Sequence, residues 1–463
     1  MICVSTRGGA PDVGFIDAML GGLAPDGGLY VPKGWPRIPR HDIAGFAGRP
    51  YAEVATAILK LFTDGDLASG VVERLCEEAY AGFDHPAVAP LVQLAPGLFL
   101  LELFHGPSLA FKDIAMQLLA RLYDHVLVAN GSTATIVCAT SGDTGGAAVE
   151  AFRGLDSIRL VILFPENRIS ERQRRFMTTS GDANIHVAAV DGDFDDCQAL
   201  LKSILADRTF ANAGLAAVNS INLARIVAQT VYYFTAAAAL GSPERPVTFA
   251  VPTGNFGDAY AGYAATAMGL PVERLVVATN SNDIVARALE AGRYQRGSTK
   301  ATLSPAMDIQ VASNFERFWF GCSGRNANDT AVAFRAFAAS GSVDIPPPTH
   351  RRMRELLGGV AITEAQTLAT MRATFEGSGV IVDPHTAVAL ASAQADPARD
   401  SRTPVVVLST AHAAKFPQAV RSATGIDPPP PPRIKRLETL PEAFDRLPAE
   451  LEAVKAYVRA AAA

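Results

Sequence analysis

The stretch His105–Asp113 holds one lysine in a setting suited to covalent chemistry. Lys112 lies between an apolar Leu-Ala-Phe step and the start of a predicted helix, whose apolar face recurs at Ile114, Leu118, Leu122 and Val126. The helix dipole disfavours an ammonium group at this end, and burial disfavours it further. A neutral lysine amine can form a Schiff base. A surface lysine that extends along a helix start is the alternative, and the stretch taken alone favours it.

Two loops rich in glycine each follow a predicted strand and open a predicted helix. The first loop, 140–146, follows strand 135–139, and the second, 252–258, follows strand 247–251. Glycines let backbone N–H groups approach a ligand, and a helix N-terminus attracts anions, so each loop predicts a phosphate or carboxylate site. Ligands bind at the carboxyl ends of parallel strands in open α/β sheets. Neither loop matches the mononucleotide or dinucleotide motifs, which favours small anionic ligands.

A reactive lysine and two anion loops together suggest pyridoxal phosphate. One loop would take the phosphate of the cofactor, and the other a carboxylate or phosphate of the substrate. The third requirement is a partner for the pyridine nitrogen. Thr410 follows the predicted strand 405–408 and offers a hydroxyl that keeps the ring largely neutral. Helix capping is the alternative role for a threonine in this position.

The elements that must position these residues alternate between strands and helices, which predicts an α/β fold. Residues 1–95 form a predicted helical cap, with helices over 51–63 and 67–82, and the C-terminal residues 434–463 are predicted to be helical and peripheral. Proline runs at 346–348 and 428–432 are predicted linkers. Further strands are predicted at 98–104, 159–164, 185–190 and 275–279, and further helices at 147–152, 170–179, 194–208 and 220–240. Strands separated in this way indicate parallel sheets with helices on both faces.

Composition excludes several other classes of protein. The chain has 463 residues, 49% of them hydrophobic and 19% charged, with a formal net charge of −5, so a large core is expected and a nucleic-acid or membrane surface is not. The basic cluster Arg172, Arg174 and Arg175 is too short to form a polyanion groove. Five scattered cysteines without a C-x-x-C pair argue against disulfides and a metal site and fit a reducing cytosol. We see no signal peptide or membrane span, and expect a cytoplasmic protein.

The wording around Lys112, His-Gly-Pro-Ser-Leu-Ala-Phe-Lys-Asp, resembles the cofactor-lysine motif of the threonine synthase family. Other blocks of that family are matched in the same order along nearly the whole chain, most closely in its longer bacterial and fungal form. These blocks are 5–9, 26–30, 139–145, 219–225, 252–258, 304–309, 383–388 and 408–412.

The resemblance implies a fold of pyridoxal-phosphate fold type II, similar to the tryptophan synthase β subunit. Two parallel-sheet domains with flanking helices are expected beside the N-terminal helical cap of residues 1–95. The large cofactor-binding domain would comprise 96–125 and 236–463, and the small domain 126–235. A monomer or homodimer is expected.

The resemblance also implies roles for individual residues. Lys112 would hold the cofactor as a Schiff base, and Thr410 would contact the pyridine nitrogen. The loop residues expected around the cofactor phosphate are Gly254, Asn255, Phe256 and Gly257. Asp143, with Ser141 and Thr144, would face the ring edge and the substrate carboxylate. The candidates for the substrate phosphate are Arg168, Ser170, Asn222 and Arg225, for which ordinary surface or helix-face roles are the alternative.

The implied reaction converts O-phospho-L-homoserine and water into L-threonine and phosphate, the last step of threonine biosynthesis. Lys112 would act as the general base at Cα, and the cap and the small domain would close over the substrate. The alternatives are a dehydratase or phospholyase with the same cofactor, a non-catalytic relative that binds ligand, and an unrelated nucleotide-binding protein.

Three histidines near these motifs are predicted to be structural. Asp383 and Pro384 form an N-cap and first-turn pair that accounts for His385. His412 is predicted to shape the loop of Thr410, and His105 to pack beside a Gly-Pro turn. Met307 and Asp308 match a family block without an evident physical role.

Overall fold

The computed structural model describes residues 1–205, 207, 210, 214–216, 218–398, 400 and 402–462, which divide into two compact units. Unit 1 comprises Met1–Glu77, Phe83–His105 and Ser220–Pro428. Unit 2 comprises Glu78–Gly82, Gly106–Asn219 and Pro429–Ala463.

Unit 1 is built on a six-stranded sheet in the order β14-β11-β10-β15-β5-β4, in which only β4 and β5 pair antiparallel. Its strands are β4 (Leu91–Ala95), β5 (Leu98–Glu102), β10 (Val247–Pro252), β11 (Val272–Thr279), β14 (Leu357–Ala361) and β15 (Val405–Ser409). The central strands β10 and β15 are buried along their whole length, as expected for near-continuous apolar runs in a parallel sheet covered on both faces. The sheet therefore presents the carboxyl ends of β5, β10, β11, β14 and β15 along one edge.

Unit 1 contains a set of helices, some packed on this sheet and others on one another. They are α9 (Leu223–Ala239), α10 (Gly257–Ala267), α11 (Ile284–Ala291), α12 (Phe315–Cys322), α13 (Ala327–Ser340), α14 (Pro347–Leu356), α15 (Glu364–Ser378), α16 (Pro384–Ala395) and α17 (Pro417–Thr424). A hydrophobic core joins α16 and α17 to β5, β10, β11 and β15. Two 3₁₀ turns, η2 (Pro305–Met307) and η3 (Ala413–Lys415), and a two-stranded ribbon of β12 (Arg293–Gln295) and β13 (Ser342–Asp344) complete this part.

The N-terminal residues contain strands as well as helices. A three-stranded antiparallel sheet has the order β2-β1-β3. The elements here are β1 (Ile2–Ser5), β2 (Val13–Gly14), α1 (Phe15–Gly21), β3 (Tyr30–Pro32), α2 (Arg40–Gly45), α3 (Tyr51–Thr63) and α4 (Ser69–Tyr80). Helices α1, α2 and α3 pack against α9, so the first 77 residues fold as part of unit 1.

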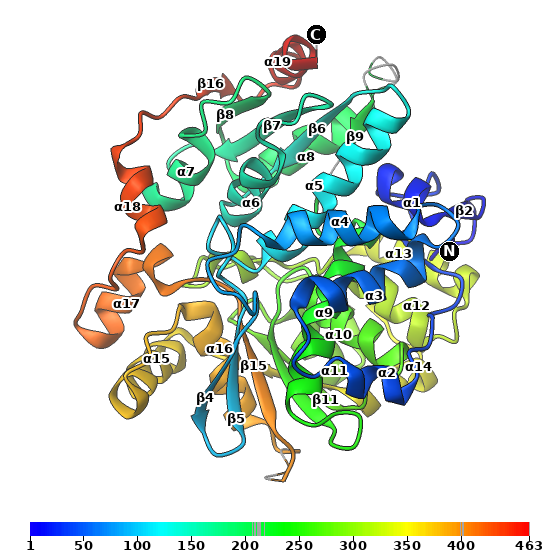
Figure 1. Cartoon of the computed structure of the whole chain (residues 1–463), viewed down its shortest axis with the longest axis vertical. Helices are drawn as coiled ribbons and strands as arrows, with labels where there is room; N and C mark the ends of the chain where they lie inside the picture. Colours follow the sequence, from blue (N-terminus) through cyan, green and yellow to red (C-terminus); the bar gives the residue numbers. More distant parts are fainter. Residues whose placement is uncertain are drawn as a thin grey trace. The chain divides into compact units, whose positions relative to one another are not determined.

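Unit 2 is built on a five-stranded sheet in the order β16-β8-β7-β6-β9, with every pair parallel (Figure 1). Its elements are α5 (Lys112–Ala129), β6 (Ala134–Ala139), α6 (Asp143–Phe152), β7 (Ile158–Pro165), α7 (Glu171–Thr178), β8 (Ile185–Asp191), α8 (Phe194–Leu205), β9 (Leu215–Ala216), α18 (Pro432–Thr439), β16 (Asp445–Pro448) and α19 (Leu451–Ala462). A second core lies between β6, β7, β8 and the helices α8 and α19.

The boundaries of the two units differ from the predicted domain ranges in several places. Residues 1–77 and 220–235 belong to unit 1, and residues 78–82 belong to unit 2. Residues 106–125 belong to unit 2 because α5 packs on α6, and residues 429–463 return to unit 2. The last difference has a clear cause, since β16 pairs with β8 and α19 covers the small sheet. The predicted three-part scheme of functional domains stays a prediction.

Most predicted elements are present within a few residues of their expected ends. The prediction of a linker at 346–348 is wrong, because Pro346 is the N-cap of α14 and Pro347 its first residue, a favourable position for proline. The C-terminal prediction missed the short strand β16 between α18 and α19. Residues 206 and 208, where the predicted helix 194–208 would end, lie outside the described residues. Within the described part of the chain, we find no helix with the length and apolar character needed to cross a membrane.

Candidate active site

A rigid turn delivers Lys112 to the first position of α5. The buried carboxylate of Asp113 accepts hydrogen bonds from Ser108 Oγ at 2.7 Å and Ser108 N at 2.8 Å. Leu109 has a left-handed backbone, with φ of 60°. A Cβ added at Gly106 would lie 2.4 Å from Cβ of Asp113, which explains why glycine stands there. The helix start and the lysine are therefore held by the residue that follows the lysine.

Asp143 is the charged partner of Lys112. The distance from Lys112 Nζ to Asp143 Oδ2 is 3.6 Å, and the two side chains are 12% and 4% exposed. The lysine amine also lies 4.7 Å from the centre of the Phe111 ring. Asp143 begins α6, where the helix dipole favours a carboxylate. A nearly buried amine that faces a buried carboxylate is an arrangement suited to moving protons.

The loop before Asp143 satisfies its own backbone donors. Thr140 Oγ1 accepts hydrogen bonds from the N–H groups of Gly142 and Gly145, each at 2.9 Å. Gly142 has φ of 131°, a conformation that only glycine adopts without strain. Of the three predicted residues in this loop, Asp143 is buried, whereas Ser141 and Thr144 are half-buried.

The second glycine loop, after β10, differs from the first where it meets its helix. Phe256 takes a left-handed conformation, with φ of 61°, and no side-chain hydrogen bond caps α10 at this residue. A Cβ added at Gly254 would lie 2.6 Å from the carbonyl oxygen of Ala306. Glycine is therefore required at 254, and the start of α10 presents backbone N–H groups suited to a phosphate.

Sequence reasoning missed two residues that support this loop. Asn314 donates from its backbone N–H and from Nδ2 to the carbonyl oxygen of Asn255, at 3.0 and 3.2 Å. Arg317 donates in turn to Asn314 Oδ1 at 2.5 Å. The Arg317 guanidinium is fully buried, and burial lowers its pKa to about 10. An arginine within the aromatic-rich segment 315–322 is the feature of the sequence that could have indicated this supporting role.

Asp308, which had no role at the sequence level, anchors the turn that touches Gly254. Its carboxylate accepts hydrogen bonds from Asn280 Nδ2, Asn282 Nδ2 and Thr302 Oγ1 at 2.8, 2.9 and 2.6 Å. This network holds η2, whose Ala306 carbonyl lies against the glycine loop.

His385 supports the same turn. The Ala306 N–H donates to His385 Nε2 at 3.3 Å, so the ring proton is on Nδ1, which donates to Asp383 at 2.7 Å. Asp383 also caps α16 by accepting from the N–H groups of His385 and Thr386. These contacts agree with the structural role predicted for His385.

Thr410 lies at the same sheet edge as the second glycine loop. Strands β10 and β15 are parallel with Ala250 opposite Val407, so Thr253 and Thr410 follow at equal offsets. The Thr410 side chain is 6% exposed. Nearby, His412 accepts from the N–H of Ala414 at 3.1 Å, and burial, aided by the charge of His105, lowers the pKa of His412. His412 thus shapes this loop, as predicted.

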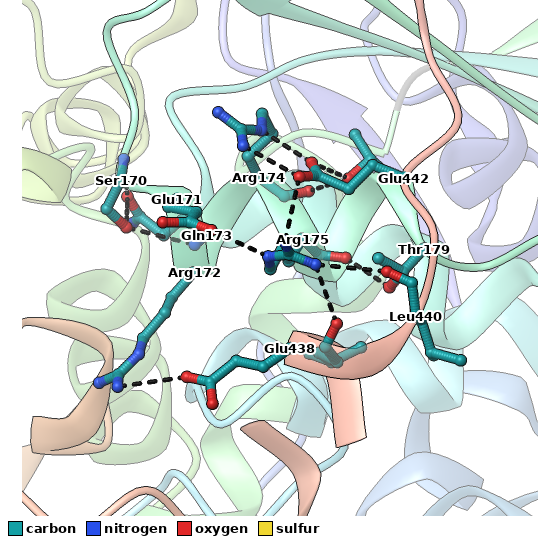
Figure 2. A network of polar contacts seen from close by, with 12 residues as sticks. Ser170, Glu171, Arg172, Gln173, Arg174, Arg175, Thr179, Glu438, Leu440 and Glu442 are labelled. Carbon is teal, nitrogen blue, oxygen red and sulfur yellow. Dashed lines mark hydrogen bonds and ion pairs between the residues drawn. The ribbon is translucent and has the colours of Figure 1, made fainter. Parts of the chain in front are cut away.

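The four candidates for the substrate phosphate form two separate pairs. Arg168 and Ser170 are exposed and precede α7 in unit 2, where Ser170 is the N-cap (Figure 2). Asn222 and Arg225 are buried at the start of α9 in unit 1. The Asn222 side chain caps α9 by accepting from the N–H of Ala224 at 3.0 Å, and donates to the Met19 carbonyl at 2.8 Å.

The residues present fit pyridoxal phosphate. They supply an amine at Lys112, a glycine loop at an open helix start, and a hydroxyl at Thr410 on the same sheet edge as that loop. The described residues contain no cluster of three or more His, Cys, Asp or Glu that could hold a metal ion.

Comparisons with known proteins agree with this interpretation. Family models match along the chain: the threonine synthase N terminus at 3–80, the pyridoxal-phosphate-dependent enzymes at 84–339, and the threonine synthase C-terminal region at 386–458. The threonine synthase of Pseudomonas aeruginosa is 48% identical over 98% of this chain and 97% of its own. The chain belongs to the threonine synthase family. It is a pyridoxal-phosphate-dependent enzyme of fold type II, and the predictions of family, fold class, cofactor and threonine synthase function are confirmed.

Solved structures of the threonine synthase family share the same fold over the whole chain. The pyridoxal-phosphate-bound threonine synthase of Brucella melitensis has a TM-score of 0.96 at 48% identity, covering 100% of this chain and 99% of its own. The yeast threonine synthase has a TM-score of 0.93 at 34% identity, covering 99% and 98%.

Proposed function

We propose that this chain converts O-phospho-L-homoserine and water into L-threonine and phosphate, in the cytoplasm, as a monomer or homodimer. The observation that carries the proposal is Lys112, the motif lysine, which stands at the start of α5 and faces the buried Asp143 at 3.6 Å. In the net reaction the Cγ–O bond and one Cβ–H bond break, Cγ gains a proton, the oxygen of water bonds to Cβ, and the proton that water loses balances the departing phosphate.

The cofactor would be held by the second glycine loop, by Lys112 and by Thr410. Gly254, Asn255, Phe256 and Gly257 would hold its phosphate at the start of α10, Lys112 its aldehyde carbon, and Thr410 its pyridine nitrogen. Asp143 would lie at the ring edge beside Lys112. When bound, the cofactor supplies an electron sink that stabilises negative charge on substrate carbon atoms.

Lys112 would move the protons of the reaction. Its neutral amine takes the proton from Cα of the substrate and returns protons to carbon later in the cycle. Asp143 stabilises the positive charge that Nζ carries between these transfers, because an opposite charge within about 4–6 Å favours the protonated amine. A buried carboxylate with 4% exposure is poorly placed to bind a second carboxylate, so Ser141 and Thr144 are better suited to the substrate carboxylate.

The substrate phosphate requires cationic and hydroxyl groups. We retain Arg168 and Ser170 before α7, with Asn222 and Arg225 at α9, as its proposed ligands. Arg168 is exposed, which suits a residue that meets an incoming anion. Asn222 already caps its helix, so Arg225 is the stronger member of the second pair.

Product analysis tests the reaction. Incubation of the holoenzyme with O-phospho-L-homoserine should release threonine and phosphate in equal amounts. Accumulation of 2-oxobutyrate and ammonia without threonine would instead identify a dehydratase or phospholyase with the same cofactor.

A spectroscopic experiment tests the lysine. The wild-type holoenzyme should show a visible absorbance band that borohydride abolishes, and Lys112→Ala should lack that band. Lys435→Ala, which removes an exposed lysine in α18, is the matched control and should keep it. A wild-type protein that stays colourless with added pyridoxal phosphate would refute the assignment of Lys112.

A further inference from the structure

The Gln173 side-chain amide bonds to the N-cap of α7 through its oxygen and to the first residue of α6 through its nitrogen. It is 5% exposed and belongs to α7. Its Oε1 accepts hydrogen bonds from Ser170 N at 3.3 Å and Ser170 Oγ at 3.2 Å, which completes a capping box (Figure 2). Its Nε2 donates to Asp143 Oδ1 at 3.1 Å. The amide therefore ties the start of α7 to the start of α6.

The contact with Asp143 leaves the other carboxylate oxygen directed at Lys112. Oδ1 is bonded to Gln173 while Oδ2 faces Lys112 Nζ at 3.6 Å. Asp113, the next residue after the lysine, directs its own carboxylate to Ser108 instead. A carboxylate held by one oxygen cannot rotate freely, so the direction of its charge is set by Gln173.

The packing around Gln173 shows that the amide fills a shaped space. A Cβ added at Gly142 would lie 2.7 Å from Cδ and 2.8 Å from Nε2 of Gln173. The glycine that allows φ of 131° in the loop thus also leaves room for the amide.

Helix α7 is braced from its other side by the C-terminal segment 437–443. Arg174 donates to both carboxylate oxygens of Glu442, at 2.8 and 2.9 Å. Arg175 Nη1 donates to the carbonyl oxygens of Leu437 and Leu440, at 3.2 and 3.3 Å (Figure 2). The arginines noted in the sequence as a short basic cluster therefore fix the helix that carries Gln173.

We propose that Gln173 is a positioning residue for the reaction, which holds Asp143 by Oδ1 so that Oδ2 stays directed at the amine of Lys112. The inference rests on the proposed role of Lys112 as the cofactor lysine. In this proposal Gln173, an uncharged residue of α7, influences through Asp143 how readily the amine of Lys112 on α5 holds a proton.

The chain contains a matched control for the helix-capping role alone. Helix α15 begins with a second capping box, in which Gln366 Oε1 accepts from Thr363 N at 2.9 Å and Thr363 Oγ1 at 2.8 Å. Gln366 is exposed. Gln173→Met and Gln366→Met therefore each remove a capping glutamine, but only the first also removes a contact with a buried carboxylate.

The test measures the pH midpoint of the visible band of the lysine-bound cofactor in the holoenzyme. Gln173→Met should lower this midpoint by about one pH unit, because a carboxylate that is no longer held stabilises the protonated lysine nitrogen less well. Gln366→Met should leave the midpoint unchanged. In an Asp143→Asn background, Gln173→Met should cause no further shift, since the effect acts through Asp143.

Two results would overturn the inference. One is a wild-type midpoint in Gln173→Met, and the other is an equal shift with and without Asp143. If Gln173→Met does not fold, Gln173→Asn, whose amide is one methylene too short to reach, gives the same test. A borohydride-sensitive band that persists in Lys112→Ala would instead refute the proposed function, so the two failures are distinguishable.

Discussion

The two glycine loops follow the same strand–glycine–helix pattern but differ in the hydrogen bonding at the start of the helix. In each, a buried parallel strand runs into small residues and then a helix. In the 140–144 loop, Thr140 accepts from two backbone N–H groups, and the first helical residue is the carboxylate Asp143. In the 253–257 loop, Thr253 Oγ1 donates back to the Val251 carbonyl at 2.8 Å, and the helix start has no side-chain cap at Phe256.

This difference shows what a strand–glycine–helix pattern can and cannot predict. A helix start whose donors are already bonded is a poor site for a phosphate. An open helix start beside a required glycine is a good one. The proposed function accordingly assigns the cofactor phosphate to the loop of unit 1 and the carboxylate partner of Lys112 to the loop of unit 2.

The largest effect that separates the loops is expected from Gly254→Ala. The added Cβ would lie 2.6 Å from the Ala306 carbonyl oxygen, and relief of the overlap should displace the loop at a cost of about 1–3 kcal/mol. Titration of apoenzyme with pyridoxal phosphate should show an affinity loss of roughly 5- to 150-fold. Gly377→Ala, in α15 with open space around it, is the control and should retain wild-type affinity. Tight binding by Gly254→Ala would contradict the assignment of this loop to the cofactor phosphate.

Thr140→Val should reduce the stability of the fold more than it reduces cofactor binding. It leaves the buried N–H groups of Gly142 and Gly145 without their acceptor, which should reduce the free energy of unfolding by about 1–3 kcal/mol in denaturant titrations. Thr230→Val, which removes a buried hydroxyl that donates to the Val227 carbonyl within its own helix, should cost less. A loss of cofactor affinity as large as that of Gly254→Ala would show that both loops bind the phosphate.

The brace on α7 should produce a smaller effect that depends on pH. Hydrogen bonding to Arg174 lowers the pKa of Glu442 below its ordinary value of 4.5. The stability that this carboxylate contributes is therefore fully present above pH 4.5 and is lost as the pH falls through its lower folded value. Glu442→Gln should unfold more easily at neutral pH and show less change in stability below pH 4.5 than the wild type. Equal acid sensitivity in thermal melts of both proteins would exclude this contribution.

Ser313→Ala should have the smallest effect on the comparison. Ser313 Oγ donates to Asn255 Oδ1 at 3.3 Å, a long and half-buried bond, while Asn314 holds the same residue by its backbone carbonyl. We expect a loss of about 0.5–1 kcal/mol in the free energy of unfolding, and a cofactor affinity within about threefold of wild type. A larger loss of affinity would indicate that Asn255 is positioned through its side chain.

Much of the fold follows from local patterns in this sequence. The apolar β-branched runs at 247–251 and 405–408 predicted buried parallel strands, and the four-residue spacing after Lys112 predicted α5. Asp383 followed by Pro384 predicted the start of α16, because the cap and the ring of proline act within one turn. The strand β16 could not be predicted in this way, since it is short and gains its partner β8 from more than 250 residues away.

In the candidate site, too, some features follow from the local sequence and others only from the tertiary structure. Residue types and spacing predicted Lys112 at a helix start, the two glycine loops and the hydroxyl of Thr410 at a strand end, because each of these features depends on the backbone conformation next to it. Tertiary structure alone decided that Arg174 and Arg175 bind the C-terminal segment, that Asp308 anchors the turn behind Gly254, and that Gln173 holds Asp143. The physical reason is that hydrogen bonds between distant segments depend on which faces the packed core brings together. Those faces cannot be predicted from the local sequence.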